Sequence, residues 1–308
     1  MKKKVSIIGA GNVGASLAQM IVQSGIADVV LFDIADGIPQ GKALDLSEAC
    51  PLWGSSSSIM GTNDYSYTEN SDVIVITAGF PRKPGMSRDD LLHANAKVVS
   101  DVVENTTKIS PNAVIIVVTN PMDVMAQVSM KVSGFVPSRV VGMGGILDSA
   151  RFRTFVAWEM GVSPEDVEAL VLGGHGDIMV PMPRFTTVKG VPITELISKD
   201  RIDALVERTR HGGAEIVALL KIASAYYAPA AATYQMVKAV LFDEKRMLPC
   251  SVHLNGEYGV NGVYIGVPVI LGFGGIKNII ELKLNRQERA DFERSVAAVK
   301  SLVEKLNL

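Results

Sequence analysis

The chain has 308 residues, of which 48% are hydrophobic and 20% charged, and its formal net charge is −2. This composition supports one large domain or two ordinary ones and argues against disorder. The mixed charges argue against a surface for nucleic acid or anionic membranes, which would need a basic excess. Two distant cysteines, Cys50 and Cys250, form no metal-ligand spacing, and we expect a reduced, cytoplasmic protein without a metal. The basic start "MKKK" has no convincing cleavage site after it, so we expect no signal peptide.

The first half of the chain alternates short β-branched runs with helical patterns. Strands are expected at residues 5–8, 29–33, 73–77, 114–119 and 140–143. Helices are expected between them, at residues 12–24, 38–50, 89–109 and 122–133. Continuously apolar strands separated by helices indicate a parallel sheet that is covered on both faces. The sequence therefore predicts an α/β fold with a Rossmann-type, doubly wound parallel sheet in this half.

The second half has a different rhythm. Helical patterns cover residues 147–160 and 212–240, and a polar amphipathic helix is expected at 286–306. Residues 251–280 are rich in Gly, Val and Tyr, with turns at "LNGEYG" and "GFGG", and they predict an antiparallel meander. We therefore place a domain boundary near residue 144. A Rossmann domain at residues 1–144 is followed by a mixed α+β domain at residues 145–308.

The motif "GAGNVG" directly follows the first strand and opens the first helix. Glycines there permit a tight turn, close approach to a pyrophosphate, and packing of the helix on the strand, and the helix N-terminus favours an anion. Asp33 ends the second strand, where an acid accepts hydrogen bonds from an adenosine ribose. The next residues, "IADG", carry no Arg or Lys for a 2′-phosphate, so NAD is favoured over NADP as the cofactor. The predicted cofactor-binding residues of the loop are Gly9, Ala10, Gly11, Asn12, Val13 and Gly14.

A histidine between glycines, His175 in "LGGHGD", suits a proton donor and acceptor because histidine titrates near neutral pH. In "GILDSAR", Asp148 and Arg151 are three residues apart and share one face of a predicted helix. An aspartate that accepts the other ring N–H fixes the tautomer and favours the imidazolium. Arg151 can grip a carboxylate with two parallel hydrogen bonds. The alternative is an ion pair that only stabilises the helix.

The stretch "GFPRKPGMSRDDLL", which follows the strand at 73–77, combines two prolines with two arginines six residues apart, Arg82 and Arg88. Basic turns of this kind are usually solvated. Together with His175 and the phosphate loop, however, the stretch predicts a lid that carries its arginines to the site.

Together these motifs resemble the lactate/malate dehydrogenase family over essentially the whole chain. The matching stretches stand in the family's order: "GAGNVG", Asp33, "PRKPGMSRDDLL", "VTNPMD", "GGILDSARFR" and "GGHGD". Three more, "GIPQGKALDL", "VERTRHGGAEIV" and "AYYAPAAAT", are similar to the malate dehydrogenase branch that resembles lactate dehydrogenases. The resemblance implies reversible NAD-dependent oxidation of (S)-malate to oxaloacetate, as in the tricarboxylic acid cycle. It also implies an active site between an NAD-binding and a substrate domain, in a homodimer or homotetramer.

The resemblance further implies roles for single residues. His175 is similar to the acid/base of the family, with Asp148 as its partner and Arg151 as the clamp on the C1 carboxylate. Arg88 resembles the arginine that polarises the reacting carbonyl, and Arg82 resembles the one that reads a second carboxylate. Asn120 is similar to a residue that contacts the substrate near the nicotinamide, with the backbone of Val118 nearby, and Asn95 resembles a cofactor contact. The segment 224–233 resembles a pocket lining, without a role for a particular residue.

Three alternatives remain. A lactate or other 2-hydroxyacid dehydrogenase would leave Arg82 without a second carboxylate to bind. An NAD-dependent glycosidase would need a metal site, and no Cys/His ligand cluster is apparent in the sequence. A catalytically silent NAD-binding protein would have no use for His175, Asp148 and three arginines.

Overall fold

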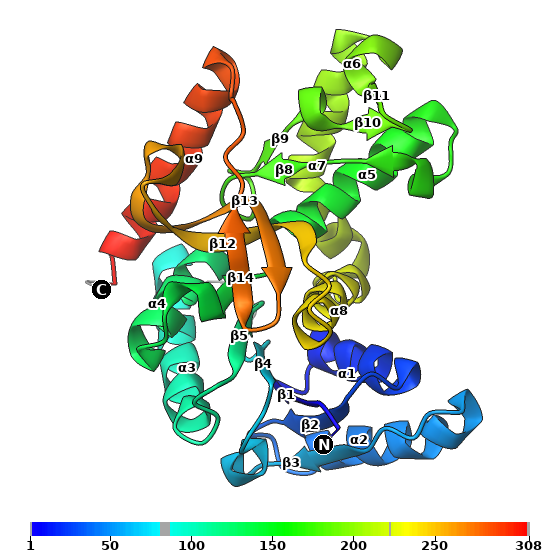
Figure 1. Ribbon diagram of the computed structural model, residues 1–308, viewed down its shortest axis with the longest axis vertical. Helices are drawn as coiled ribbons and strands as arrows, with labels where there is room; N and C mark the ends of the chain where they lie inside the picture. The colour runs from blue at the N-terminus through cyan, green and yellow to red at the C-terminus, as the bar shows by residue number, and fades with distance from the viewer. Residues whose placement is uncertain (1, 81–86, 222, 307–308) are drawn as a thin grey trace.

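The computed structural model describes residues 2–80, 87–221 and 223–306, without the side chain of Arg88 (Figure 1). The first half contains six parallel strands that alternate with helices, as predicted. The strands are β1 (Lys4–Ile8), β2 (Asp28–Phe32), β3 (Ile59–Thr62), β4 (Val73–Ile76), β5 (Val114–Val117) and β6 (Val140–Gly142). The helices are α1 (Asn12–Ser24), α2 (Ile38–Ala49), α3 (Arg88–Thr107) and α4 (Met122–Ser133). Strand β3 was not predicted because its sequence "IMGT" is short and contains a glycine.

The order of these strands is β6-β5-β4-β1-β2-β3, so the chain reverses direction across the sheet between β1 and β4. In such a sheet ligands bind beyond the carboxyl ends of the strands, in the crevice at this reversal. The four residues of β4 and of β5 are buried without exception, because helices cover both faces. Figure 1 shows α1 and α8 on one side of these strands and α3 and α4 on the other. The doubly wound fold is therefore confirmed.

The second half begins with α5 (Gly145–Met160) and ends with α9 (Arg286–Glu304). Short strands follow α5: β7 (Val167–Glu168), β8 (Val171–Leu172), β9 (Val180–Pro181), β10 (Thr187–Val188) and β11 (Val191–Pro192). The remaining helices are α6 (Ile193–Leu196), α7 (Lys199–Leu220) and α8 (Tyr227–Leu241). The predicted antiparallel meander is present as β12 (Arg246–Asn255), β13 (Asn261–Gly272) and β14 (Gly275–Ile279).

One prediction for the second half was wrong. The helical pattern at 212–240 is not a single helix, because α7 ends at Leu220 and α8 begins at Tyr227. Pro229 explains the break, since a proline ring clashes with the carbonyl four residues earlier and lacks an N–H to donate. The first turn of α8 tolerates this proline, whereas the interior of a continuous helix would not.

The two halves share one sheet in the part of the chain that the structure describes. Strand β12 pairs antiparallel with β6 through Ser251 and Gly142, which gives a nine-stranded order β14-β13-β12-β6-β5-β4-β1-β2-β3. At this pairing a Cβ on Gly142 would lie 2.2 Å from Sδ of Met122 and 2.9 Å from Cβ of Ser251. The glycine is therefore required for the strands and α4 to meet.

Within the described ranges, none of the helices combines the length and the apolar character that crossing a bilayer requires.

Candidate active site

The turn between β1 and α1 has room for a ligand on one side only. Gly9 has φ +114°, and a Cβ there would lie 2.6 Å from the amide N of Ala78. A Cβ on Gly14 would lie 1.9 Å from the carbonyl O of Gly9. A Cβ on Gly11, in contrast, would meet no described heavy atom within 4 Å. Two glycines are thus fixed by packing, and the third keeps an open approach to the first amides of α1, as a pyrophosphate site requires.

Asp33 stands at the end of β2, beside this turn. Its Oδ2 accepts a hydrogen bond from the amide N of Ala10 at 2.7 Å, and its Oδ1 accepts one from Ala35 at 3.0 Å. Each carboxylate oxygen retains a further lone pair for a ribose hydroxyl. Lys42 of α2 donates from Nζ to the carbonyl O of Ala10 at 2.6 Å. The sequence showed no basic residue directly after Asp33, but the helix brings Lys42 to the same turn, which sequence reasoning missed.

Asn95, on α3, is 1% exposed and links two loops at the carboxyl edge of the sheet. Its Oδ1 accepts from the amide N of Phe80 at 2.8 Å. Its Nδ2 donates to the carbonyl O of Phe80 at 3.2 Å and to that of Asn120 at 2.7 Å. Val118 and Asn120 lie just beyond β5, and Val118 donates from its amide to the carbonyl O of Ile76. Asn95, Val118 and Asn120, which were predicted to contact cofactor or substrate, therefore lie at one edge of the sheet.

His175 lies in the loop between β8 and β9, and two residues of α5 fix its ring. Nδ1 of His175 is 2.8 Å from Oδ2 of Asp148, and Oδ1 of Asp148 accepts from Nη1 of Arg151 at 3.2 Å. All three side chains are largely buried, at 13%, 2% and 12% exposure for His175, Asp148 and Arg151. The structure therefore brings together the three residues that the sequence placed in one cluster.

The charges around His175 favour its protonated form. Burial acts to lower the pKa of His175, but the charge of Asp148 and its hydrogen bond outweigh burial, and Asp123 adds to them. Arg151 acts in the opposite direction. The net effect is a pKa above that of free histidine, and Nε2 is the ring nitrogen that remains for a substrate.

A second carboxylate behind the ring was missed. Asp123, in the first turn of α4, is 4% exposed and accepts a 2.8 Å hydrogen bond from the amide N of His175. Ser251 of β12 donates from Oγ to its other oxygen at 2.6 Å. Burial raises the pKa of Asp123, while these two hydrogen bonds favour its charged form. The motif "VTNPMD" contains Asp123. The sequence does not show that the amide of His175, 52 residues later, is hydrogen-bonded to this carboxylate.

Two predicted site residues belong to the segment after β4. Arg82 lies outside the described residues, and so do Pro81, Pro84 and Gly85. Arg88 is the first residue of α3, and Ser87 and Asp90 form a reciprocal capping box there. The structure does not describe the side chain of Arg88. The predicted lid and the roles of both arginines therefore stay predictions.

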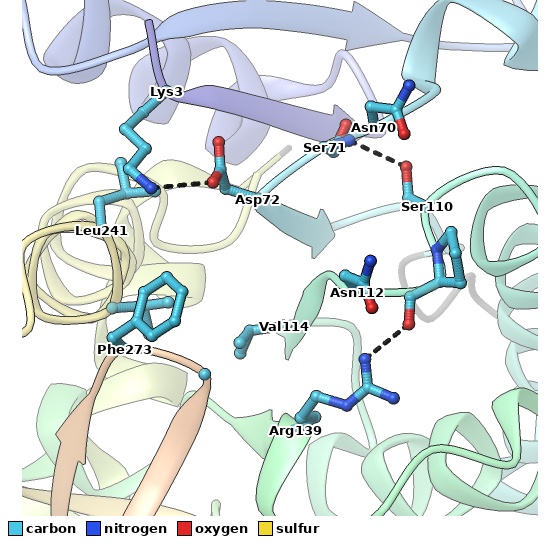
Figure 2. A pocket seen from close by; sticks show the side chains of 13 residues that line it. Lys3, Asn70, Ser71, Asp72, Ser110, Asn112, Val114, Arg139, Leu241 and Phe273 are labelled. Atoms are coloured by element: carbon cyan, nitrogen blue, oxygen red, sulfur yellow. Dashed lines mark hydrogen bonds and ion pairs between the residues drawn. The ribbon is translucent and has the colours of Figure 1, made fainter. Parts of the chain in front are cut away.

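A large cavity of about 550 Å³ lies at the opposite, amino edge of the sheet (Figure 2). Figure 2 shows Lys3 paired with Asp72, and Nη1 of Arg139 donates to the carbonyl O of Pro111 at 2.6 Å. Its charged groups thus have partners within the protein, and none of the predicted site residues lines it. The predicted site residues lie instead at the carboxyl edge of the sheet, around the turn after β1 and around His175.

Residues 3–142 match the family described as lactate/malate dehydrogenase, NAD binding domain. Residues 146–307 match lactate/malate dehydrogenase, alpha/beta C-terminal domain. A malate dehydrogenase of Thermomicrobium roseum is 60% identical over 304 residues, which cover 99% of this chain and 98% of that protein.

Two solved structures have nearly the same fold. The malate dehydrogenase of Salinibacter ruber has a TM-score of 0.95 at 50% identity, over 99% of this chain and 97% of that one. A lactate dehydrogenase of Cryptosporidium parvum, complexed with lactic acid and β-nicotinamide adenine dinucleotide, has a TM-score of 0.97 at 44% identity. That match covers 100% of this chain and 98% of the other.

Proposed function

The chain belongs to the lactate/malate dehydrogenase family, and from this premise we propose how its residues divide the work of the reaction. It is an NAD-dependent oxidoreductase that oxidises malate reversibly to oxaloacetate. The main support for these roles is the hydrogen-bonded cluster of His175, Asp148 and Arg151. It combines an imidazole that can carry a proton, a carboxylate fixed beside it, and a guanidinium. Bound NAD would accept the hydride that malate loses from C2.

His175 is the acid/base. Its Nδ1 is held by Asp148, so Nε2 takes the hydroxyl proton of malate as the alcohol is oxidised. Asp148 then stabilises the imidazolium. In the reverse direction Nε2 returns this proton to the carbonyl oxygen, where negative charge develops. The raised pKa of His175 supports this role, because it keeps a proton on the ring at the start of oxaloacetate reduction.

Three arginines recognise the anionic parts of the substrate in this proposal. Arg151 grips the C1 carboxylate, which both malate and lactate carry. Arg88 polarises the reacting carbonyl, and Arg82 binds the second carboxylate, which only malate carries. The buried position of Arg151 beside Asp148 supports its role. The roles of Arg82 and Arg88 rest on the family's sequence motif.

The turn after β1 and the acid after β2 would hold the cofactor. The open side of Gly11 and the tight packing of Gly9 and Gly14 fit a dinucleotide pyrophosphate. Asp33 would receive the adenosine ribose. The complete set proposed for the cofactor is Gly9, Ala10, Gly11, Asn12, Val13, Gly14, Asp33, Asn95, Val118 and Asn120.

The same proposal covers the organisation of the protein. We place the boundary between the NAD-binding and the substrate domain at residue 144, between β6 and α5. We also propose a homodimer or homotetramer that works in the cytoplasm, in the tricarboxylic acid cycle. The proposed assembly rests on the resemblance of the chain to the family.

The test follows NADH consumption with oxaloacetate and with pyruvate, side by side. We expect a much higher kcat/KM for oxaloacetate. A preference for pyruvate would contradict the assignment of Arg82 and would move the chain to the lactate dehydrogenases of the family. Light scattering on the same sample gives the oligomeric state.

A further inference from the structure

Two adjacent glycines, Gly212 and Gly213, lie inside α7, a helix of 22 residues. Glycine is the weakest helix former apart from proline, since it loses the most backbone freedom on folding. A pair in the interior of a helix therefore needs a physical reason. The stretch "RTRHGGAEIV" that contains them was singled out in the sequence, but the cofactor and catalytic roles do not explain it.

The reason for one of the two glycines is a contact with α5, which runs beside α7 (Figure 1). A Cβ on Gly212 would lie 2.9 Å from Cδ and 3.4 Å from Nε of Arg151. It would also lie 3.7 Å from Cε2 of Phe155, which is an ordinary contact. The stem of Arg151 thus occupies the space that any larger residue at position 212 would fill.

Gly213 differs from Gly212 in this respect. A Cβ there would lie 3.7 Å from Nη2 and 3.9 Å from Nη1 of Arg151. These are ordinary van der Waals distances, so an alanine fits at position 213 without displacing the guanidinium. The neighbouring glycines therefore provide a matched pair, one tight against Arg151 and one not.

Burial and a hydrogen bond restrain the side chain of Arg151 at this contact. Its Nη1 is bonded to Asp148, and its side chain is 12% exposed. Its Nε is buried and has no hydrogen-bond partner among the described residues. A shift at Cδ would be carried to the guanidinium and would change the bond to the carboxylate that also holds His175.

We propose that Gly212 is a positioning residue for substrate binding, which lets α7 close on the stem of Arg151 and so directs the guanidinium toward the C1 carboxylate of the substrate. This inference rests on the proposed role of Arg151 as the clamp. Misplacement of such a clamp is costly, because binding depends on the alignment of two parallel hydrogen bonds.

The kinetic test compares Gly212→Ala with Gly213→Ala. Gly212→Ala should raise KM for oxaloacetate by about tenfold or more and change kcat less, as loss of uniform binding does. KM for pyruvate should rise by a similar factor, because both substrates carry the C1 carboxylate. Gly213→Ala should keep both values near those of the wild type. NADH affinity, followed by fluorescence, should be unchanged in both variants. Equal kinetics for the two variants would overturn the inference.

A double-mutant cycle on Tm measures the contact between position 212 and Arg151 independently of enzyme activity. Alanine is the better helix former, so Gly213→Ala should raise Tm. Gly212→Ala should raise Tm less or lower it, whereas in the Arg151→Ala background it should raise Tm as Gly213→Ala does. If the effect of Gly212→Ala on Tm were the same in both backgrounds, there would be no steric contact to explain. If instead Arg151→Ala left KM unchanged, the proposed clamp would fail while the contact could still be measured.

Discussion

Nδ1 of His175 lies 2.8 Å from Oδ2 of Asp148, and the carboxylate that makes this bond is almost fully buried. The bond decides which ring nitrogen is available to the substrate and raises the pKa of the imidazole. Arg151, on the same carboxylate, opposes the rise. The charges of Asp148 and Arg151 therefore both act on the pKa of His175, and replacing either residue should change it.

Replacing Asp148 with Asn should lower activity and shift its pH dependence. In the proposed mechanism reduction of oxaloacetate needs protonated His175, so kcat/KM should fall as pH rises through the pKa of the imidazole. Without the charge of Asp148 this pKa is lower, and the fall should begin at lower pH. We expect a loss of about 10²–10⁴ in kcat near neutral pH. A pH profile identical to that of the wild type would contradict the pairing of Asp148 with His175. His175→Asn is the control, since it should lose most of the turnover while it still binds NADH.

The same shift affects stability. A histidine whose pKa is raised on folding adds stability that is fully present below its unfolded pKa of about 6.5. That contribution is lost as pH rises through the folded-state pKa. Urea unfolding of the wild type and of Asp148→Asn should therefore give a difference in unfolding free energy that narrows at alkaline pH.

Asp123 should matter for its hydrogen bonds to the main chain of His175 and to Ser251. Asp123→Ala leaves two buried donors without an acceptor, which costs about 1–3 kcal/mol of unfolding free energy for each. Its kcat should fall, because the loop that carries His175 loses an anchor on α4. Asp123→Asn keeps one acceptor oxygen and should restore most of kcat. Equal loss of kcat in both variants would indicate that the charge of Asp123, and not its hydrogen bond, is what the site needs.

Asp33 should select NADH over NADPH. Its carboxylate would repel a 2′-phosphate, and the nearby Lys42 already donates to the carbonyl of Ala10. Comparing kcat/KM for the two cofactors at fixed oxaloacetate should show a preference of at least about tenfold, or 1.4 kcal/mol. Asp33→Ser should reduce it, whereas Lys42→Ala should not. Wild-type protein that uses both cofactors equally would remove Asp33 from this role.

Arg82 should set the choice between oxaloacetate and pyruvate. Breaking one side of a buried charge pair costs roughly 3–5 kcal/mol, which corresponds to roughly 10²–10⁴ in kcat/KM. Arg82→Gln should therefore lower kcat/KM for oxaloacetate by about this factor and raise it for pyruvate. Arg88→Gln is the matched control, because it acts on the carbonyl that both substrates share and should impair both. An unchanged preference in Arg82→Gln would contradict the assignment.

The sequence predicted those parts of the site whose chemistry is local. The glycines of the turn after β1 and the spacing of Asp148 and Arg151 each lie within a few residues, so a motif is enough to find them. Asp123 was missed because the amide of His175, to which it is hydrogen-bonded, lies far along the chain, and no local pattern marks such a contact. Lys42 was missed for a related reason, since the helix α2 folds it back onto the turn.

In the fold, too, features with a local sequence signal were predicted and those without one were not. Apolar runs with β-branched residues predicted the buried strands of the first half, because burial on both faces leaves a continuous signal. The strands β7 to β11 have two residues each, too few for any periodicity. The break between α7 and α8 was overlooked because the apolar residues around it continue a helical pattern, although Pro229 could have marked it.

The pairing of Ser251 with Gly142 has a consequence for the modularity of this protein. At this pairing Gly142 packs against Met122 and Ser251 without room for a further atom. The two halves are therefore not joined by a flexible linker at which recombination could exchange one of them. A chimera that joins this nucleotide-binding half to a foreign substrate half would have to bring its own strand against β6, with a small side chain facing Gly142 and a donor for Asp123. In this chain Met122, Asp123, Gly142 and Ser251 are therefore expected to tolerate replacement only as a matched set.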